Sequence, residues 1–130
     1  VREASELLHA DRIGHGVRAV EDPAVVDLIL DRDLRLEVCP GSNLKLGVAR
    51  DLASHPLLKL DAAGVAYSLA SDDPALFQLD LVSEYLCLHR AYAWSSAKLF
   101  DIACAGVEHS FLPADRKRDL RARQAALRPA

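Results

Sequence analysis

Three short segments carry the side chains that are best suited to chemistry. They are Gly14-His15-Gly16, the run from Cys39 to Asn43, and Ser71-Asp72-Asp73-Pro74. Each follows a stretch whose pattern predicts a β-strand. In parallel β/α proteins, active sites lie at the carboxyl ends of the strands. We therefore expect the three segments to meet at one edge of a sheet.

His15 is the first candidate for a catalytic role. It lies between two glycines, which allow a sharp backbone turn and a close approach of a ligand to the imidazole. Such a ring can bind a metal, act as a general base, or interact with a metal-bound hydroxide. The alternative is a histidine that is hydrogen-bonded to a neighbouring carbonyl in a glycine-rich turn. The local residues leave both open.

Asp72 and Asp73 place two carboxylates side by side before a proline. Adjacent residues that leave a strand point in different directions, so the two need not share one task. Asp73 before Pro74 is typical of a helix N-cap. Asp72 ends a buried strand, where a carboxylate must find a metal, a cation or several donors. Carboxylate oxygen is an accepted ligand for hard and borderline cations.

The other reactive side chains give weaker indications. Cys39 could be a nucleophile, but we interpret it as a small buried core residue. Four histidines show no metal-ligand spacing and are interpreted as structural or surface residues: His9, His55, His89 and His109.

The elements that position these residues alternate along the first half of the chain. Strands are expected at 12–16, 34–39 and 65–70, where apolar residues alternate or run together. Helices are expected at 2–9, from Asp22-Pro23 onward, and at 55–63, whereas the stretch from Pro40 to Ser54 is expected to be mostly loop. Further helices are expected at 78–92, 95–105 and 113–125. The chain is predicted to be one domain over 1–130, with parallel β/α units over 1–76 and C-terminal helices over 77–130.

Composition narrows the class of protein. Of the 130 residues, 51% are hydrophobic and 27% are charged, which favours a folded chain with a core. The formal net charge of −3 argues against a nucleic-acid binder. No stretch approaches the roughly 18 apolar residues of a membrane helix. Three cysteines cannot form a complete disulfide framework, which favours a reducing cytoplasm.

Taken in order, these segments resemble the adenosine deaminase family. The resemblance covers about residues 10–120 and rests on four motifs: Arg12-Ile13-Gly14-His15-Gly16, Leu36-Glu37-Val38-Cys39-Pro40-x-Ser42-Asn43, Ser71-Asp72-Asp73-Pro74, and the ending from Ser110 to Arg118. It implies an α/β fold that is the C-terminal part of a TIM (β/α)8 barrel, with strands six to eight and the closing helices.

The resemblance also implies a reaction, the zinc-dependent hydrolytic deamination of adenosine or a related 6-aminopurine nucleoside. One zinc ion lowers the pKa of a bound water, and the hydroxide adds to C6 of the purine and releases ammonia. Asp72 matches the zinc ligand on the last strand. His15 matches the histidine that orients and helps deprotonate the zinc-bound water, and Asp73 matches the aspartate that hydrogen-bonds the purine ring. Adenine-specific members carry an acid where this chain has Gly14, which favours a nucleoside.

Departures from the family pattern limit what this chain is expected to do alone. It has no His-x-His pair and no His-Ala-Gly-Glu run, which supply the other zinc ligands and the proton shuttle. It has three of eight strands, and a complete barrel takes about 250 residues. We therefore expect a piece of a longer enzyme, inactive alone, whose partner is the N-terminal portion of the barrel. The alternatives are a non-catalytic α/β remnant or interaction module, and an unrelated doubly wound α/β domain.

Overall fold

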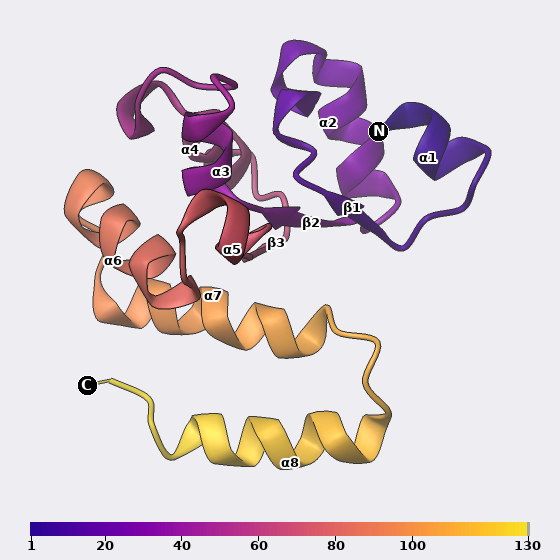
Figure 1. The fold of residues 1–130 in the computed structure, drawn as a ribbon. Helices are drawn as coiled ribbons and strands as arrows, with labels where there is room; N and C mark the ends of the chain where they lie inside the picture. Colours follow the sequence, from indigo (N-terminus) through magenta and orange to yellow (C-terminus); the bar gives the residue numbers. More distant parts are fainter. Residues whose placement is uncertain (130) are drawn as a thin grey trace.

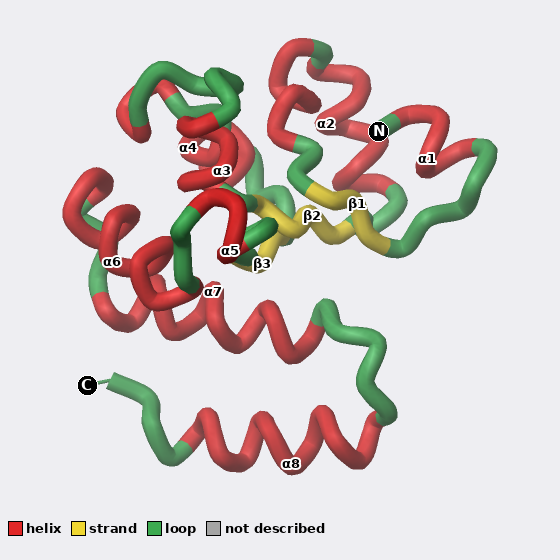
Figure 2. Tube along the Cα trace, viewed as in Figure 1, coloured by secondary structure: helices red, strands yellow, loops and turns green. Residues whose placement is uncertain are grey.

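A three-stranded parallel sheet forms the centre of the protein, of which the computed structural model describes residues 1–129 (Figures 1 and 2). Its strands are β1 (Arg12–Gly14), β2 (Arg35–Val38) and β3 (Tyr67–Leu69), in the spatial order β1-β2-β3. Ile13 pairs with Leu36 and Glu37 with Ser68. All three strands fall where the sequence predicts them, and their carboxyl ends share one edge.

Short helical segments connect the strands. β1 leads through the 3₁₀ segment η1 (Val17–Glu21) and α2 (Pro23–Asp31) to β2, and the chain then passes through α3 (Pro40–Lys45), η2 (Leu52–Ser54) and α4 (Leu57–Ala62) to β3. The first helix, α1 (Arg2–Glu6), ends earlier than the expected 2–9. α2 begins as predicted, because the Asp22 carboxylate accepts the Ala24 N–H at 3.0 Å and Pro23 follows it.

The expectation of a loop after Pro40 is wrong over residues 40–45, which form α3. Pro40 suits the first helical position because its missing N–H would have no partner there. Ser42 and Asn43 are turn residues by type, yet both are buried and their side chains are hydrogen-bonded to distant residues. Tertiary contacts have therefore overridden the local preference for a loop.

The remaining chain is helical, as the sequence predicts. The elements are α5 (Pro74–Phe77), α6 (Leu81–Tyr92), α7 (Ser96–Glu108) and α8 (Ala114–Ala125). α7 packs against β3 and, on its other side, against α8, so that α7 lies between the sheet and the last helix (Figure 1). The short α5 was not expected as an element of its own. Among residues 1–129, none of the helices combines the length and the hydrophobicity of a membrane-spanning segment.

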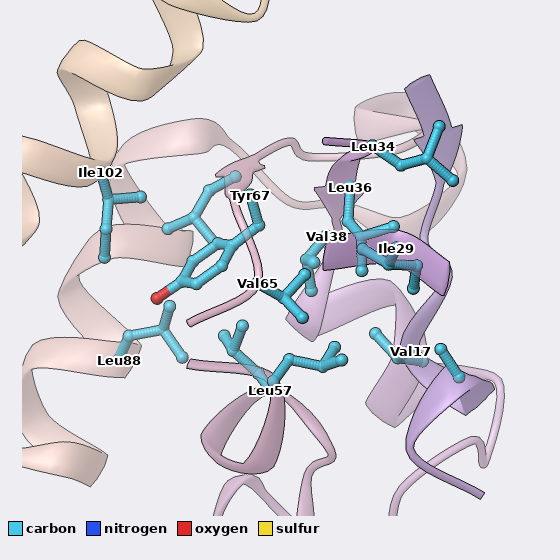
Figure 3. Packing of buried hydrophobic residues seen from close by; sticks show 13 residues of the cluster. Val17, Ile29, Leu34, Leu36, Val38, Leu57, Val65, Tyr67, Leu88 and Ile102 are labelled. Carbon is cyan, nitrogen blue, oxygen red and sulfur yellow. The ribbon is translucent and has the colours of Figure 1, made fainter. Parts of the chain in front are cut away.

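The core surrounds the middle strand. Leu36 and Val38 of β2 are fully buried, and Ile29 of α2 packs beside them (Figure 3). Leu88 of α6 and Ile102 of α7 close the helical side. Full burial of one such side chain stabilises a fold by about 1.5–3 kcal/mol. Because this cluster holds all three strands, it also fixes where their carboxyl ends lie.

Candidate active site

The carboxyl edge of the sheet brings two of the predicted site residues together. His15 follows β1 and Asp72 follows β3, and His15 Nε2 lies 3.5 Å from Asp72 Oδ2. The Ser42 hydroxyl, on α3, donates a hydrogen bond to the same carboxylate oxygen at 2.5 Å. Asn43 Nδ2 lies 3.1 Å from His15 Nδ1. The His15 imidazole and the Asp72 carboxylate are thus each held by a neighbouring side chain, with Nε2 facing Oδ2.

The backbone at this edge is strained. His15 has φ +56° and Asp72 has φ +59°, in the left-handed region that residues other than glycine seldom adopt. Each costs about 1–3 kcal/mol, and such strain clusters at functional sites. Gly16 also has positive φ, and a Cβ there would lie 2.7 Å from Leu36. The glycine after His15 is therefore required both for its conformation and for packing against β2.

Asp73 does not join this pair. It is the N-cap of α5, and its Oδ1 accepts the Leu76 N–H at 2.9 Å. This contact confirms the N-cap interpretation of Asp73. Its contact with a purine stays a prediction.

Cys39 directly follows β2 at this edge and is buried, as the sequence predicts, with 5% of its surface exposed. Burial, together with the negative charge of Asp72, raises the pKa of the Cys39 thiol to about 11. The thiol therefore stays protonated at neutral pH and is a poor nucleophile.

The donor atoms at this edge fit a zinc ion only in part. A nitrogen of His15, the sulfur of Cys39 and an oxygen of Asp72 lie within 4.8 Å of one another. Zinc accepts all three atom types, and a catalytic zinc usually has three protein ligands. The three atoms reach the usual number of protein ligands only if zinc deprotonates the Cys39 thiol, as it does with thiols that it binds. Without that thiol, a complete site needs ligands from outside these residues.

Two buried polar residues at this edge, Asn43 and His55, were given no role at the site by the sequence pattern alone. Asn43 and His55 are each 2% exposed, and His55 Nε2 lies 3.1 Å from Asn43 Oδ1. His55 Nδ1 accepts the Leu57 N–H at 3.0 Å. Burial lowers the pKa of His55, which keeps its ring neutral. His55 is thus structural, as interpreted, yet it is hydrogen-bonded to a residue that touches His15.

Glu84 on α6 is a third residue that the sequence did not single out. It is 1% exposed, and its Oε2 accepts the Gly41 N–H at 2.9 Å. Burial raises the pKa of this carboxyl. A Cβ at Gly41 would collide with the other carboxylate oxygen. This contact ties the closing helices to the first turn of α3, which carries Ser42 and Asn43.

An open cavity of about 700 Å³ lies beside His15. Gly14, His15 and Asn43 are part of its wall, and most of the other lining residues are apolar. A Cβ at Gly14 would meet nothing within 4 Å. Cavities that bind small molecules measure about 300–1,000 Å³ and are mostly apolar with a few polar groups. This cavity has the size and lining to take part of a planar, partly apolar ligand.

Comparisons with known proteins agree with this geometry. The adenosine deaminase family model matches residues 1–126. An adenine deaminase from Rhizobium leguminosarum bv. trifolii is 43% identical over 123 residues, which are 95% of this chain and 38% of that protein. The chain therefore spans little more than a third of the length of such relatives.

Solved structures show the same relation. The crystal structure of an adenine deaminase from Arthrobacter aurescens matches with a TM-score of 0.92 at 32% identity, over 97% of this chain and 38% of that one. An amidohydrolase from Burkholderia ambifaria, solved with bound Zn, matches with a TM-score of 0.83 at 24% identity, over 96% of this chain and 35% of that one. The sheet and its helices are thus part of an α/β barrel, and the chain belongs to the adenosine deaminase family.

Proposed function

We propose that this chain forms part of the active site of an enzyme that hydrolytically removes ammonia from a 6-aminopurine, with zinc as its metal. The observation that carries the proposal is the pairing of His15 Nε2 with Asp72 Oδ2 at 3.5 Å, on strained backbone at the carboxyl edge of the sheet. Membership of the adenosine deaminase family and the bound Zn of one structural relative support it.

Asp72 would hold the metal, together with ligands from the rest of the barrel. A zinc ion at this place would supply a Lewis acid and an activated water at neutral pH. Ser42 would support this role, because its hydroxyl donates a hydrogen bond to one oxygen of Asp72 and so orients the carboxylate. Such supporting hydrogen bonds orient metal ligands, and their loss typically costs about 10–100-fold in affinity or activity.

His15 and Asp73 would act on the other reactants. His15 Nε2 points to the Asp72 carboxylate, so it lies where it can orient the attacking water through a hydrogen bond. Asp73 uses Oδ1 to cap α5, and its second oxygen would hydrogen-bond the purine ring. The cap holds Asp73 in place, and fixed placement of reacting groups is a general source of rate enhancement in enzymes.

The substrate class is proposed as an aminopurine nucleoside. The space at Gly14, beside His15 and open to the cavity, leaves room next to the reacting ring. Free adenine is the competing substrate, because relatives that are about 40% identical are named adenine deaminases. The same catalytic residues would serve both.

The test is a chimeric enzyme in which this chain replaces the matching segment of the Rhizobium leguminosarum adenine deaminase. Ammonia release from adenosine and from adenine is compared by kcat/KM, and zinc content is measured by elemental analysis. The proposal expects turnover with about one zinc per chain, and a higher kcat/KM for the nucleoside. A folded chimera that binds zinc and deaminates neither compound would instead make this chain a non-catalytic remnant.

A further inference from the structure

A chain of hydrogen bonds behind His15 connects its ring to the start of α4. The Leu57 N–H donates to His55 Nδ1 at 3.0 Å. His55 Nε2 lies 3.1 Å from Asn43 Oδ1, and Asn43 Nδ2 lies 3.1 Å from His15 Nδ1. Asn43 and His55 are each 2% exposed, so their hydrogen bond to each other is shielded from water, whereas the His15 end of the chain of bonds borders the cavity.

The backbone N–H of Leu57 determines which atom donates in the first two hydrogen bonds, Leu57–His55 and His55–Asn43. A backbone N–H can only donate, so His55 Nδ1 must present a lone pair. A neutral imidazole has one N–H, which is then on Nε2 and donates to Asn43 Oδ1. The Asn43 amide cannot be turned round, because its NH₂ group would then face the N–H of His55. The NH₂ group of Asn43 must therefore face His15.

The same logic decides the tautomer of His15. Asn43 Nδ2 donates to His15 Nδ1, which must present a lone pair, so the proton of the neutral ring is on Nε2. Nε2 is the atom that lies 3.5 Å from Asp72 Oδ2. We propose that Asn43 and His55 are positioning residues that hold His15 in the Nε2–H tautomer, so that it meets the reaction centre as a hydrogen-bond donor.

This assignment changes what His15 does. A ring with its proton on Nε2 orients water or substrate by donating a hydrogen bond, and it cannot accept a proton at that atom while neutral. The resemblance to the family assigns His15 a share in deprotonating the water, and the tautomer leaves that step to another group. The catalytic meaning rests on the proposed function, whereas the tautomer follows from the hydrogen bonds alone.

The direct test is ¹⁵N NMR of the histidine side chains in the chimeric enzyme. The metal is removed with a chelator, the pH is held at about 8 so that exposed rings are neutral, and His15 is assigned by the loss of its signals in His15→Gln. The expected spectrum shows protonated Nε2 and unprotonated Nδ1 for His15. The opposite pattern in the unsubstituted protein overturns the proposal.

The Asn43→Asp variant distinguishes control of the His15 tautomer by Asn43 from a purely structural role of this side chain. It keeps the shape of the side chain but presents acceptors to both histidines, so His15 should move its proton to Nδ1. The expected kinetic effect is a fall in kcat of about 10–100-fold, the size typical of lost supporting contacts, with KM and zinc content little changed. A folded Asn43→Asp protein whose His15 stays in the Nε2–H form would contradict the proposal.

His55 supplies the matched pair of variants. His55→Gln keeps an N–H donor for Asn43 and should preserve the Nε2–H form of His15, whereas His55→Leu removes the donor and should give a mixture of tautomers. Identical His15 tautomers in the Gln and Leu variants would remove His55 from the proposal. A chimera that shows the expected tautomers but no deamination would refute the proposed function and leave the hydrogen-bond relay intact.

Discussion

The strand-bearing region, residues 1–76, and the closing helices, residues 77–129, bury different kinds of side chain. Of the six buried polar side chains in the part of the chain described, five belong to the first region: Ser5, Ser42, Asn43, His55 and Ser68. Glu84 is the one in the second, and α8 buries none of its residues. Buried polar groups cost free energy unless they are hydrogen-bonded. In the first region Ser42, Asn43 and His55 meet this requirement through hydrogen bonds to one another or to His15 and Asp72, so these three buried polar groups gather at the candidate site.

The largest effect expected concerns the site as a whole. The 130-residue chain alone, supplied with zinc, should release no ammonia from adenosine or adenine. Its sequence lacks the His-x-His pair and the His-Ala-Gly-Glu run, which by the family resemblance supply the other zinc ligands and the proton shuttle. The measurement is ammonia release beside a His15→Ala control. Turnover by the chain that exceeds this control would show that the first region carries a complete site.

Zinc retention should distinguish the roles of Asp72 and His15 in the first region. In the chimeric enzyme, Asp72→Ala should lose zinc under a chelator challenge and lose activity with it. His15→Ala should keep its zinc and lose about 10²–10³-fold in kcat, the usual loss for one donor at a reacting centre. Elemental analysis beside turnover distinguishes the two. If Asp72→Ala keeps full zinc while His15→Ala loses it, the proposed roles are wrong.

Asp73 lies at the boundary between the two regions and should show two separable effects. Asp73→Ala removes the cap of α5, worth about 1 kcal/mol, and misplaces the purine, which can cost about 100-fold in rate. Asp73→Ser keeps a capping oxygen, so it should recover the stability but not the rate. Urea midpoints and kcat, with zinc content unchanged in both, check this. If Asp73→Ser keeps the full rate, Asp73 caps α5 but does not position the purine.

The sequence predicts the first region well where the information is local. The alternation over 34–39 gives β2, the apolar run over 65–70 gives β3, and Asp22-Pro23 gives the start of α2. The meeting of His15 with Asp72 follows from the rule that parallel strands share a carboxyl edge. Local patterns and one topological rule are therefore enough to place these two side chains.

Long-range contacts explain what the sequence did not predict. The helix at 40–45 holds Ser42 and Asn43, whose partners Asp72 and His15 are 30 and 28 residues away in the chain. Glu84 contacts Gly41 across 43 residues. A single glutamate on an amphipathic helix is typical of a solvent-facing position, and nothing local marks it as buried. The first two contacts need the folded first region, and the contact of Glu84 with Gly41 needs both regions in place.

The last expected effect is on stability alone, and it compares a buried glutamate of the second region, Glu84, with an exposed one, Glu108. In the chimeric enzyme, Glu84→Ala should leave the buried Gly41 N–H without its partner, which costs about 1–3 kcal/mol of stability. Glu108→Ala removes an exposed ion pair with Arg121 between α7 and α8 and should barely move the urea midpoint, because exposed pairs contribute little.

The pH dependence of this stability has a definite sign. Burial raises the pKa of Glu84, so the folded protein holds this proton more tightly than the unfolded chain. The protonated Glu84 therefore stabilises the folded protein fully at a pH below the ordinary carboxyl pKa. This contribution is lost as the pH rises from there through the raised pKa of Glu84. Glu84→Gln keeps an acceptor for Gly41 but cannot ionise, so its urea midpoint should fall less over that pH range than that of the unsubstituted protein. Parallel pH profiles for the two would mean that Glu84 is not the group that titrates, and that the link between the closing helices and α3 does not depend on its charge.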